Sequence, residues 1–135
     1  MDTDGFKYKE ITEKIIKAYY TVYNKLGYGF LERVYENAMA IELKKSALIV
    51  EKQVSIAVFY EGENVGAYFA DLVVSDAVII ELKACSDLLE EHEAQLTNYV
   101  RATDIEVGLL LNFGRKPQIK RKAFSNEYKI KGPGL

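Results

Sequence analysis

The chain has 135 residues, of which 49% are hydrophobic and 28% charged, a composition typical of one globular domain with its own core. Its formal net charge of -2 at pH 7 argues against a protein that coats nucleic acid without selectivity. No apolar run is long enough to cross a membrane, and the polar, acidic N-terminus is unlike a signal or transit peptide. One cysteine, Cys85, cannot form an internal disulfide, so we expect a reducing, cytoplasmic setting.

Helical periodicity dominates the first third of the chain. Apolar residues recur at helical spacing from Ile11 to Leu26, and Gly27 is a usual residue for a left-handed C-cap. A second helix is predicted to begin near Phe30. Its predicted inner face consists of Leu31, Val34, Tyr35, Ala38 and Ile41.

The spacing changes to a period of two from about Val54, which predicts a strand that ends at Tyr60. A turn at residues 61–64 leads back into a second strand, 65–74, and a turn around Asp76 leads to a third strand. The third strand carries the triplet Glu81-Leu82-Lys83.

The next elements are a helix and a late strand. Asp87 and Glu90 have the spacing of a capping pair for a helix that ends near Ala102, and residues 105–111 are an apolar strand. The connection is long enough for this strand to be parallel to the third one. The predicted fold class is α/β (α+β), with a mixed central sheet flanked by helices in a single domain, residues 1–135.

The charges of the C-terminal part differ from those of the rest. Residues 112–135 contain seven basic residues and one acid, whereas residues 1–111 contain eleven basic residues and nineteen acids. Such a basic flank could hold a phosphate backbone close to an acidic cleft. A solvated surface strand and a frayed terminus would explain the same charges without a partner.

The triplet is the first candidate site. Charges at the end of so apolar a strand are costly unless they are paired or bind a metal. Glu81 and Lys83 share a strand face, and Asp71 lies ten residues before Glu81 on the second strand. A three-residue turn centred on Asp76 would place Asp71 opposite Glu81, and we predict this odd turn. Two acids and a lysine so placed could hold a divalent cation beside a phosphodiester, although Glu-x-Lys is also a common weak ion pair.

Further motifs follow in the order found in a known family. The matching residues are Gly29, Glu32 and Tyr35 of a GxxExxY signature, Asp71, Glu81-Leu82-Lys83, and the run from Gln95 to Tyr99. From about Ile11 to Arg121 the chain resembles GxxExxY family proteins, a branch of the PD-(D/E)XK nuclease superfamily. Ala70 stands where the superfamily has its proline. The resemblance implies a restriction-endonuclease-like fold and a metal-dependent nuclease that acts on nucleic acid, DNA rather than RNA.

The resemblance also implies roles for individual residues. Asp71 and Glu81 are expected to bind Mg²⁺ or Mn²⁺, with the backbone carbonyl of Leu82 as a further oxygen ligand. Glu32 is expected to complete the metal shell directly or through water. Lys83 is expected to orient or deprotonate the attacking water and to offset charge on the phosphorane.

The helix after the triplet supplies two more candidates. Gln95 and Tyr99 match a QxxxY pattern that positions the lysine, the water or a phosphate, and their spacing lets both face one cleft. We expect Gln95 to be catalytic and Tyr99 to bind nucleic acid. The basic residues expected to bind nucleic acid with it are Arg115, Lys116, Lys120 and Arg121. His92 could be a proton shuttle on the same helix or a structural residue.

These residues also have structural explanations. Glu32 suits the first turn of a helix, and Gln95 with Tyr99 could be a polar pair at the edge of the core. The alternative function is therefore a catalytically silent nuclease-fold module that binds nucleic acid or a protein partner. We expect no membrane partner, and a homodimer or a protein partner would help so small a domain to hold its substrate.

Overall fold

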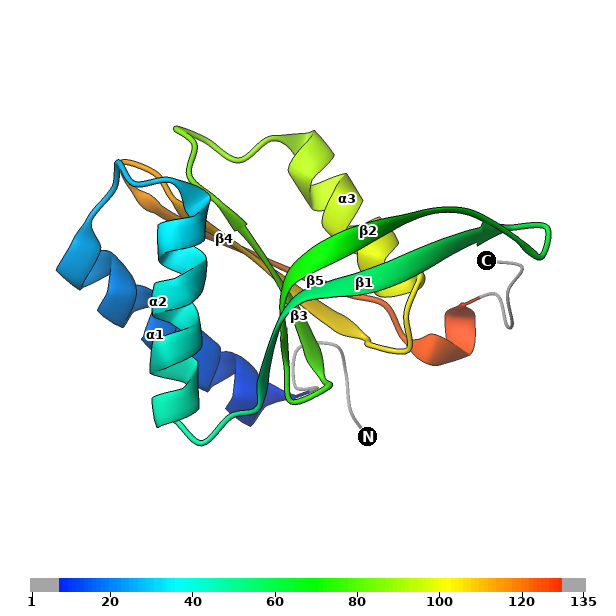
Figure 1. Cartoon of the computed structure of the whole chain (residues 1–135), viewed down its shortest axis with the longest axis horizontal. Helices are drawn as coiled ribbons and strands as arrows, with labels where there is room; N and C mark the ends of the chain where they lie inside the picture. The colour runs from blue at the N-terminus through cyan, green and yellow to red at the C-terminus, as the bar shows by residue number, and fades with distance from the viewer. Residues whose placement is uncertain (1–7, 130–135) are drawn as a thin grey trace.

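The computed structural model describes residues 8–129, which form a five-stranded mixed sheet between helices (Figure 1). The elements in chain order are α1 (Lys9–Leu26), α2 (Glu32–Lys45), β1 (Val50–Tyr60), β2 (Glu63–Val74), β3 (Val78–Lys83), α3 (Glu90–Arg101), β4 (Val107–Phe113), β5 (Pro117–Ala123) and the 3-10 turn η1 (Asn126–Tyr128). The strands follow one another across the sheet, and every neighbouring pair is antiparallel except β3 and β4, which are parallel. The predicted mixed sheet and its parallel pair are confirmed.

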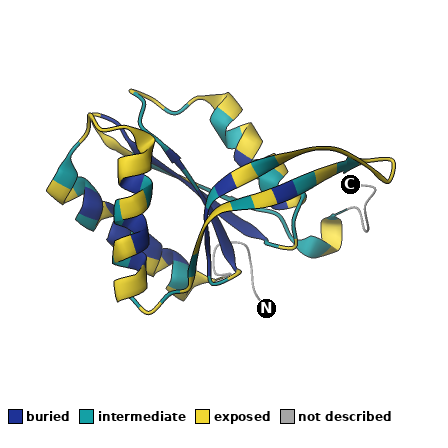
Figure 2. Ribbon diagram, viewed as in Figure 1, coloured by how far each residue is buried: buried dark blue, intermediate teal, exposed yellow. Residues whose placement is uncertain are grey.

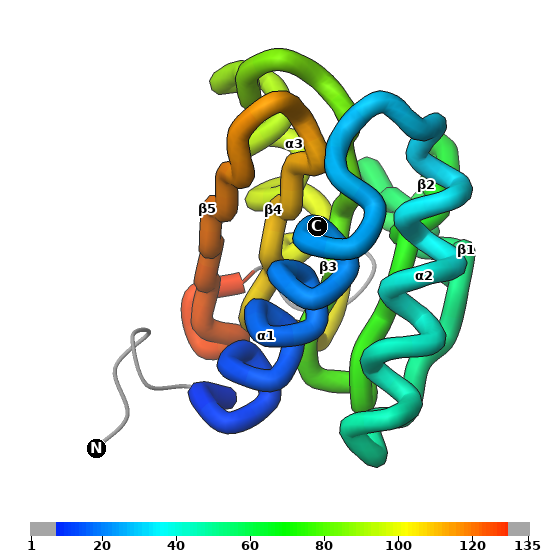
Figure 3. The backbone as a smooth tube through the Cα atoms, turned by 90° about the vertical axis from the view of Figure 1, so that its left-hand side faces the viewer, coloured from blue at the N-terminus to red at the C-terminus, as the bar shows by residue number. Residues whose placement is uncertain are grey.

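The helices cover the two faces of the sheet unequally. Helices α1 and α2 pack on one face and α3 on the other (Figure 3). Strand β4 lies between both layers and is buried along its whole length, as Figure 2 shows in dark blue. A Cβ at Gly108 of β4 would lie 2.7 Å from Leu96 and 2.9 Å from Val100 of α3, so glycine permits this close packing. None of the helices in residues 8–129 is long and apolar enough to cross a membrane.

The N-terminal helices confirm the predicted periodicity but correct one face. Helix α1 ends at Leu26 with Gly27 as its C-cap, as predicted, and the φ of +66° at Gly27 favours glycine. Its ψ of -163° differs from that of the predicted left-handed cap. The predicted inner face of α2 is confirmed for Tyr35, which is buried, and for Ala38, which packs against the core. It was wrong for the other three residues, because Leu31 is 82% and Ile41 59% exposed, and Val34 is exposed too. The buried residues of α2 are Tyr35, Met39, Ala40 and Leu43. Tyr35 lies on both the predicted and the observed face, and its ring stacks on Phe113 of β4 with ring centroids 4.2 Å apart.

The turns between the strands fix the register of the sheet. The β1–β2 turn is the two-residue pair Glu61-Gly62, and both residues have positive φ, as in a type I′ hairpin. Val74 pairs with Val78, so the β2–β3 turn has three residues with Asp76 at its centre. The predicted odd turn is therefore confirmed. Strand β1 begins four residues earlier than expected, at Val50 rather than Val54.

The remaining differences lie around α3 and the basic flank. Asp87 and Glu90 do not cap α3; the helix begins at Glu90, and the Leu89 N–H donates to Nδ1 of His92 at 3.1 Å. The first part of the basic flank is strand β5, which pairs with β4. Residues 130–135 of the flank, with Lys131, lie outside the described residues.

Candidate functional site

The two acids meet where the backbone ladder between β2 and β3 ends. The last ladder pair on this side is Leu72 with Ile80. Beyond it, the Asp71 N–H donates to Oε2 of Glu81 at 3.1 Å, and the Leu82 N–H donates to Oδ2 of Asp71 at 2.8 Å. Side-chain oxygens therefore replace the carbonyl acceptors of the ladder, and the two carboxylates lie side by side at the point where the strands part.

The environment of Glu81 opposes its ionisation. Burial raises the pKa of Glu81 to about 8, and the nearby carboxylate of Asp71 adds to the rise. The hydrogen bond from the Asp71 N–H and the charge of Lys83 act in the opposite direction without offsetting it. Two half-buried acids this close favour a bound proton or a bound cation.

Lys83 and Glu32 belong to the same charged group. Ile80 and Leu82 of β3 are packed into the α1–α2 side of the core, so Glu81 and Lys83 point to the α3 side. Burial raises the pKa of Glu32, while the charge of Lys83 lowers it and that of Asp71 raises it. The first residue of α2 is thus electrostatically coupled to both strands of the site.

The GxxExxY spacing has a structural reason. Gly29 has a φ of +111°, a conformation that favours glycine. The Tyr35 hydroxyl donates to the Gly27 carbonyl at 2.7 Å and accepts from the Phe30 N–H at 3.2 Å. Tyr35 therefore fastens the loop that precedes α2, and Glu32, almost one helical turn earlier, is held at the site by the same helix.

Helix α3 places Tyr99 beside the two acids, whereas Gln95 of the same helix makes no hydrogen bond to them. The Tyr99 ring stacks on Tyr68 of β2, with ring centroids 3.4 Å apart and an interplanar angle of 19°. Burial raises the pKa of Tyr99, and the charges of Glu81 and Asp71 raise it further. Gln95 is exposed, and its side chain has no hydrogen bond within residues 8–129.

The sequence did not identify two residues of this site, Tyr68 and Gln53. The Tyr68 hydroxyl is buried and has no hydrogen-bond partner among the described residues. Gln53 of β1 donates through Nε2 to Oε1 of Glu36 at 2.7 Å and to Oδ1 of Asp71 at 3.3 Å. Neither residue lies in a motif, and their contacts depend on strands that are distant in the sequence.

Asn112 was also missed as an individual residue. It is fully buried at the end of β4, donates through Nδ2 to the Cys85 carbonyl at 2.8 Å, and accepts from the Cys85 N–H at 3.0 Å. A buried asparagine in an apolar run was the available signal, because a buried amide needs partners. Asn112 thereby fixes the chain directly after Lys83.

The basic residues do not gather on one face. Arg115 lies over the Tyr28 ring at 5.7 Å, and Lys116 is 3.7 Å from the Asp87 carboxylate. Both belong to the β4–β5 turn, which lies at the same end of the molecule as the α1–α2 loop (Figures 1 and 3). Lys120 and Arg121 are consecutive residues of β5, so their side chains point to opposite faces of the sheet.

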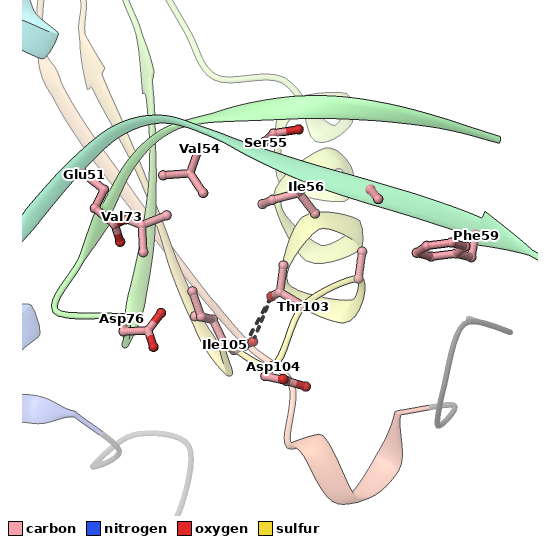
Figure 4. Close-up of a pocket in the computed structure, with 12 residues that line it drawn as sticks. Glu51, Val54, Ser55, Ile56, Phe59, Val73, Asp76, Thr103, Asp104 and Ile105 are labelled. Carbon is pink, nitrogen blue, oxygen red and sulfur yellow. Dashed lines mark hydrogen bonds between the residues drawn. The ribbon is translucent and has the colours of Figure 1, made fainter. Parts of the chain in front are cut away.

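A pocket of about 460 Å³ lies between β1 and the loop after α3 (Figure 4), and neither Asp71 nor Glu81 lines it. Three acids, Glu51, Asp76 and Asp104, contribute to its lining, and no basic residue does. A phosphate would be repelled by such a lining. The pocket is therefore a poorer candidate for a nucleic-acid site than the Asp71–Glu81 pair.

The Asp71–Glu81 pair suits a hard divalent cation in its chemistry. Its donors are carboxylate oxygens, with the Leu82 carbonyl in the same strand, and such oxygens are the ligands that Mg²⁺ prefers. A cation would also relieve the repulsion that raises the pKa of Glu81. Within residues 8–129, however, no three acidic, histidine or cysteine side chains are gathered closely enough to form a ready metal cluster. Glu32 is thus a neighbour of the pair and not an assembled third ligand.

Comparison with known proteins identifies the fold family. No curated protein matches the chain. A solved structure titled "Crystal structure of SSO0001" is similar to it, with a TM-score of 0.53 and 20% sequence identity over 87% of this chain and 58% of that one. This likeness shows the fold, and the chain spans little more than half of that protein. A family model described as the PD-(D/E)XK nuclease superfamily matches residues 9–122, so the chain belongs to the PD-(D/E)XK nuclease superfamily.

Proposed function

We propose that this chain is a metal-dependent nuclease of the GxxExxY branch, acting in the cytoplasm on phosphodiester bonds of nucleic acid, DNA rather than RNA. The observation that carries the proposal is the pair of carboxylates, Asp71 and Glu81, held side by side by backbone N–H groups with Lys83 on the same strand. Backbone donors fix the carboxylates in place. Two acids kept this close at a cost to ionisation are typical of a functional site.

Asp71, Glu81 and the Leu82 carbonyl would hold the ion, Mg²⁺ or Mn²⁺, and Glu32 would reach it directly or through a water. When bound, the ion would polarise the phosphate and make an attacking water more acidic. Lys83 would orient that water or take its proton, and its charge would offset the negative charge that builds up on the phosphorane.

The α3 side of the site would hold the substrate. Tyr99 is fixed by its stack on Tyr68 and lies close enough to both acids for their charges to raise its pKa, which supports a role in placing a phosphate. Gln95, one turn earlier and exposed, would contact the water or a phosphate. The resemblance to the QxxxY pattern implies both roles, and the spacing lets the two side chains share one face of the helix.

A basic and aromatic rim supports nucleic acid as the substrate. Arg115 lies over Tyr28, and Lys116 is exposed beside them in the β4–β5 turn. Arginine on an aromatic ring can bind a phosphate while the ring stacks on a base. Lys120 and Arg121 would extend the positive potential along the two faces of β5, each on its own side.

The test is a calorimetric Mn²⁺ titration of the wild type, Asp71→Asn and Asp76→Asn, with cleavage assays on single- and double-stranded DNA and on RNA. Asp76 is a matched control because it is an exposed acid in the β2–β3 turn. We expect Asp71→Asn to lose metal affinity by at least about tenfold and cleavage by about a thousandfold or more, because it removes a charged ligand. Asp76→Asn should retain both.

Equal, weak Mn²⁺ binding in all three proteins and no cleavage would reject the catalytic function. The chain would then be the catalytically silent module, whose fold binds nucleic acid or a protein partner. Cleavage of RNA but not DNA would retain the mechanism and reject the proposed substrate.

A further inference from the structure

Gln53 has a backbone conformation that a residue within a strand rarely adopts. Its φ is +52°, in the left-handed region that disfavours side chains other than glycine. The other described non-glycine residues with positive φ lie at helix ends and turns, at Tyr8, Ala47, Glu61, Ser75 and Asp76. Gln53 lies inside β1, where nothing in the connection of the chain requires a turn. A strained backbone of this kind persists only where the surrounding contacts hold it, and such residues are common at functional sites.

The strain lets two consecutive side chains reach the same helix. Lys52 donates through Nζ to Oδ1 of Asn37, and Gln53 donates through Nε2 to Oε1 of Glu36 at 2.7 Å. In a regular strand, neighbouring side chains point to opposite faces. The positive φ of Gln53 removes this alternation, so both residues connect β1 to α2.

The amide of Gln53 also holds Asp71. Lys52 pairs with Leu72 and Val54 with Ala70, so Gln53 lies opposite Asp71 at the place where the ladder has a gap. Its Nε2 lies 3.3 Å from Oδ1 of Asp71, and Oδ2 of the same carboxylate accepts from the Leu82 N–H at 2.8 Å. Both oxygens of Asp71 are therefore oriented by donors, one from β1 and one from β3.

A primary amide suits this position chemically. It has two N–H bonds, one for each carboxylate, and it carries no charge. A lysine in its place would neutralise the acids and compete with a cation, whereas the amide orients Asp71 and Glu36 and leaves their charges in place. Donors behind a metal ligand commonly change its affinity in this way.

We propose that Gln53 is a positioning residue, whose strained backbone and side-chain amide fix the Asp71 carboxylate and tie it to α2, the helix that carries Glu32. The part of this inference that concerns metal rests on the proposed function of Asp71. The hold on the carboxylate itself does not depend on it.

The experiment compares Gln53→Gly, Gln53→Ala and the control Lys52→Ala. Gln53→Gly removes the amide and fits the positive φ, whereas Gln53→Ala removes the amide and keeps the strain. We expect both Gln53 variants to lose Mn²⁺ affinity about tenfold, with Gln53→Gly melting at a higher temperature than Gln53→Ala. Lys52→Ala loses the neighbouring bond to α2 but keeps the metal affinity. A merely structural role would make affinity follow the melting temperature.

A second readout uses the metal-free protein. The amide proton of Leu82 reports its hydrogen bond to Asp71, and we expect its NMR shift to change in both Gln53 variants and not in Lys52→Ala. An unchanged Leu82 amide together with wild-type Mn²⁺ affinity in both Gln53 variants would overturn the proposal. A wild type that binds no Mn²⁺, with the Leu82 amide still displaced in the variants, would reject the metal role of Asp71 and support the hold of Gln53 on it.

Discussion

The two faces of the sheet differ in whether their buried tyrosine hydroxyls have hydrogen-bond partners. On the α1–α2 face, the hydroxyls of Tyr19, Tyr23 and Tyr35 each donate to a backbone carbonyl, at Asn112, Gly114 and Gly27. The bonds of Tyr19 and Tyr23 join α1 to the end of β4, whereas the bond of Tyr35 holds the loop between α1 and α2. The Tyr35 ring also stacks on Phe113. This face satisfies its buried polar groups, as a face that stabilises the fold is expected to do.

The α3 face leaves polar groups in unfavourable surroundings. The Tyr68 hydroxyl is buried without a partner among the described residues, and the stacked Tyr68–Tyr99 pair lies beside Glu81, whose pKa burial raises to about 8. Burial raises the pKa of tyrosines on both faces, Tyr19 and Tyr23 included, but on the α3 face the charge of Glu81 raises the pKa of Tyr68 further. Such costs persist where a site needs them, since stability and activity often oppose each other. The difference between the faces supports the proposed placement of the site on the α3 side.

The largest expected effect is the loss of stability when Tyr35 on the α1–α2 face is replaced. Tyr35 is fully buried, so Tyr35→Ala should lower the free energy of unfolding by about 3–5 kcal/mol, from the lost ring contacts and the cavity. Tyr35→Phe keeps the ring and loses the hydroxyl bonds to the loop before α2, which should cost about 1 kcal/mol. Urea unfolding followed by circular dichroism measures both. A Tyr35→Ala protein within 1 kcal/mol of the wild type would contradict the assignment of this face to stability.

The second expected effect is a pH-dependent gain in stability when Glu81 on the α3 face is replaced. Because the pKa of Glu81 is raised, the folded state keeps a proton between about pH 4.5 and pH 8 that the unfolded state has released. The contribution of the protonated carboxyl to the free energy of unfolding is therefore complete below about pH 4.5 and is lost as the pH rises to about 8. Glu81→Gln cannot ionise and should therefore be more stable than the wild type by on the order of 4 kcal/mol at pH 8. Near pH 5 the two proteins should be alike, and cleavage should be lost at every pH.

Urea unfolding of the metal-free proteins at pH 5, 6.5 and 8 tests this effect. Glu63→Gln, at an exposed position at the start of β2, is the matched control and should not change the pH profile. A Glu81→Gln protein that is less stable than the wild type at pH 8 would show that the ionised carboxylate is stabilised in the folded chain, contrary to the comparison of the faces.

The sequence was sufficient for the register that joins the two acids. The alternation of β3 and the odd turn at Asp76 together place Asp71 opposite Glu81, because a one-residue change would put them on different faces. The inner face of α2 could not be chosen in the same way. Apolar residues occur on more than one side of that helix, and Tyr35 belongs to both the predicted and the observed face. The burial of Met39 and Leu43 in place of Val34 and Ile41 depends on core partners that are remote in the sequence.

Two features of the candidate site leave no signal in the sequence. Gln53 contacts Asp71 only because its own backbone has a positive φ, a conformation that a glutamine does not suggest. The unpaired hydroxyl of Tyr68 is defined by the lack of a partner, which no spacing can predict. The α3 cap failed for a related reason, since the N-cap is Leu89 and not Asp87, and Nδ1 of His92 accepts from the Leu89 N–H. Local polar contacts of this kind depend on the folded backbone.

The smallest effect gives the sharpest comparison, because it removes one oxygen atom from each face. Tyr23→Phe removes the donor to the Gly114 carbonyl, a bond of 2.6 Å, and should cost about 1 kcal/mol of unfolding free energy. Tyr68→Phe removes a hydroxyl that has no partner within residues 8–129, so it should be neutral or stabilise by up to about 1 kcal/mol. Both free energies come from urea unfolding at pH 7.

The same pair separates stability from function. If the Tyr68 hydroxyl remains unpaired so that it can donate to a phosphate or a water beside Glu81, Tyr68→Phe should lower the cleavage rate while Tyr23→Phe leaves it near that of the wild type. A Tyr68→Phe protein as unstable as Tyr23→Phe would mean that the hydroxyl is satisfied in solution, and the two faces would then no longer differ in the way that the structure indicates. If Tyr68→Phe keeps its stability and loses cleavage activity, the Tyr68 hydroxyl belongs to the site. A buried donor without a protein partner would then make its hydrogen bond to the bound substrate or water.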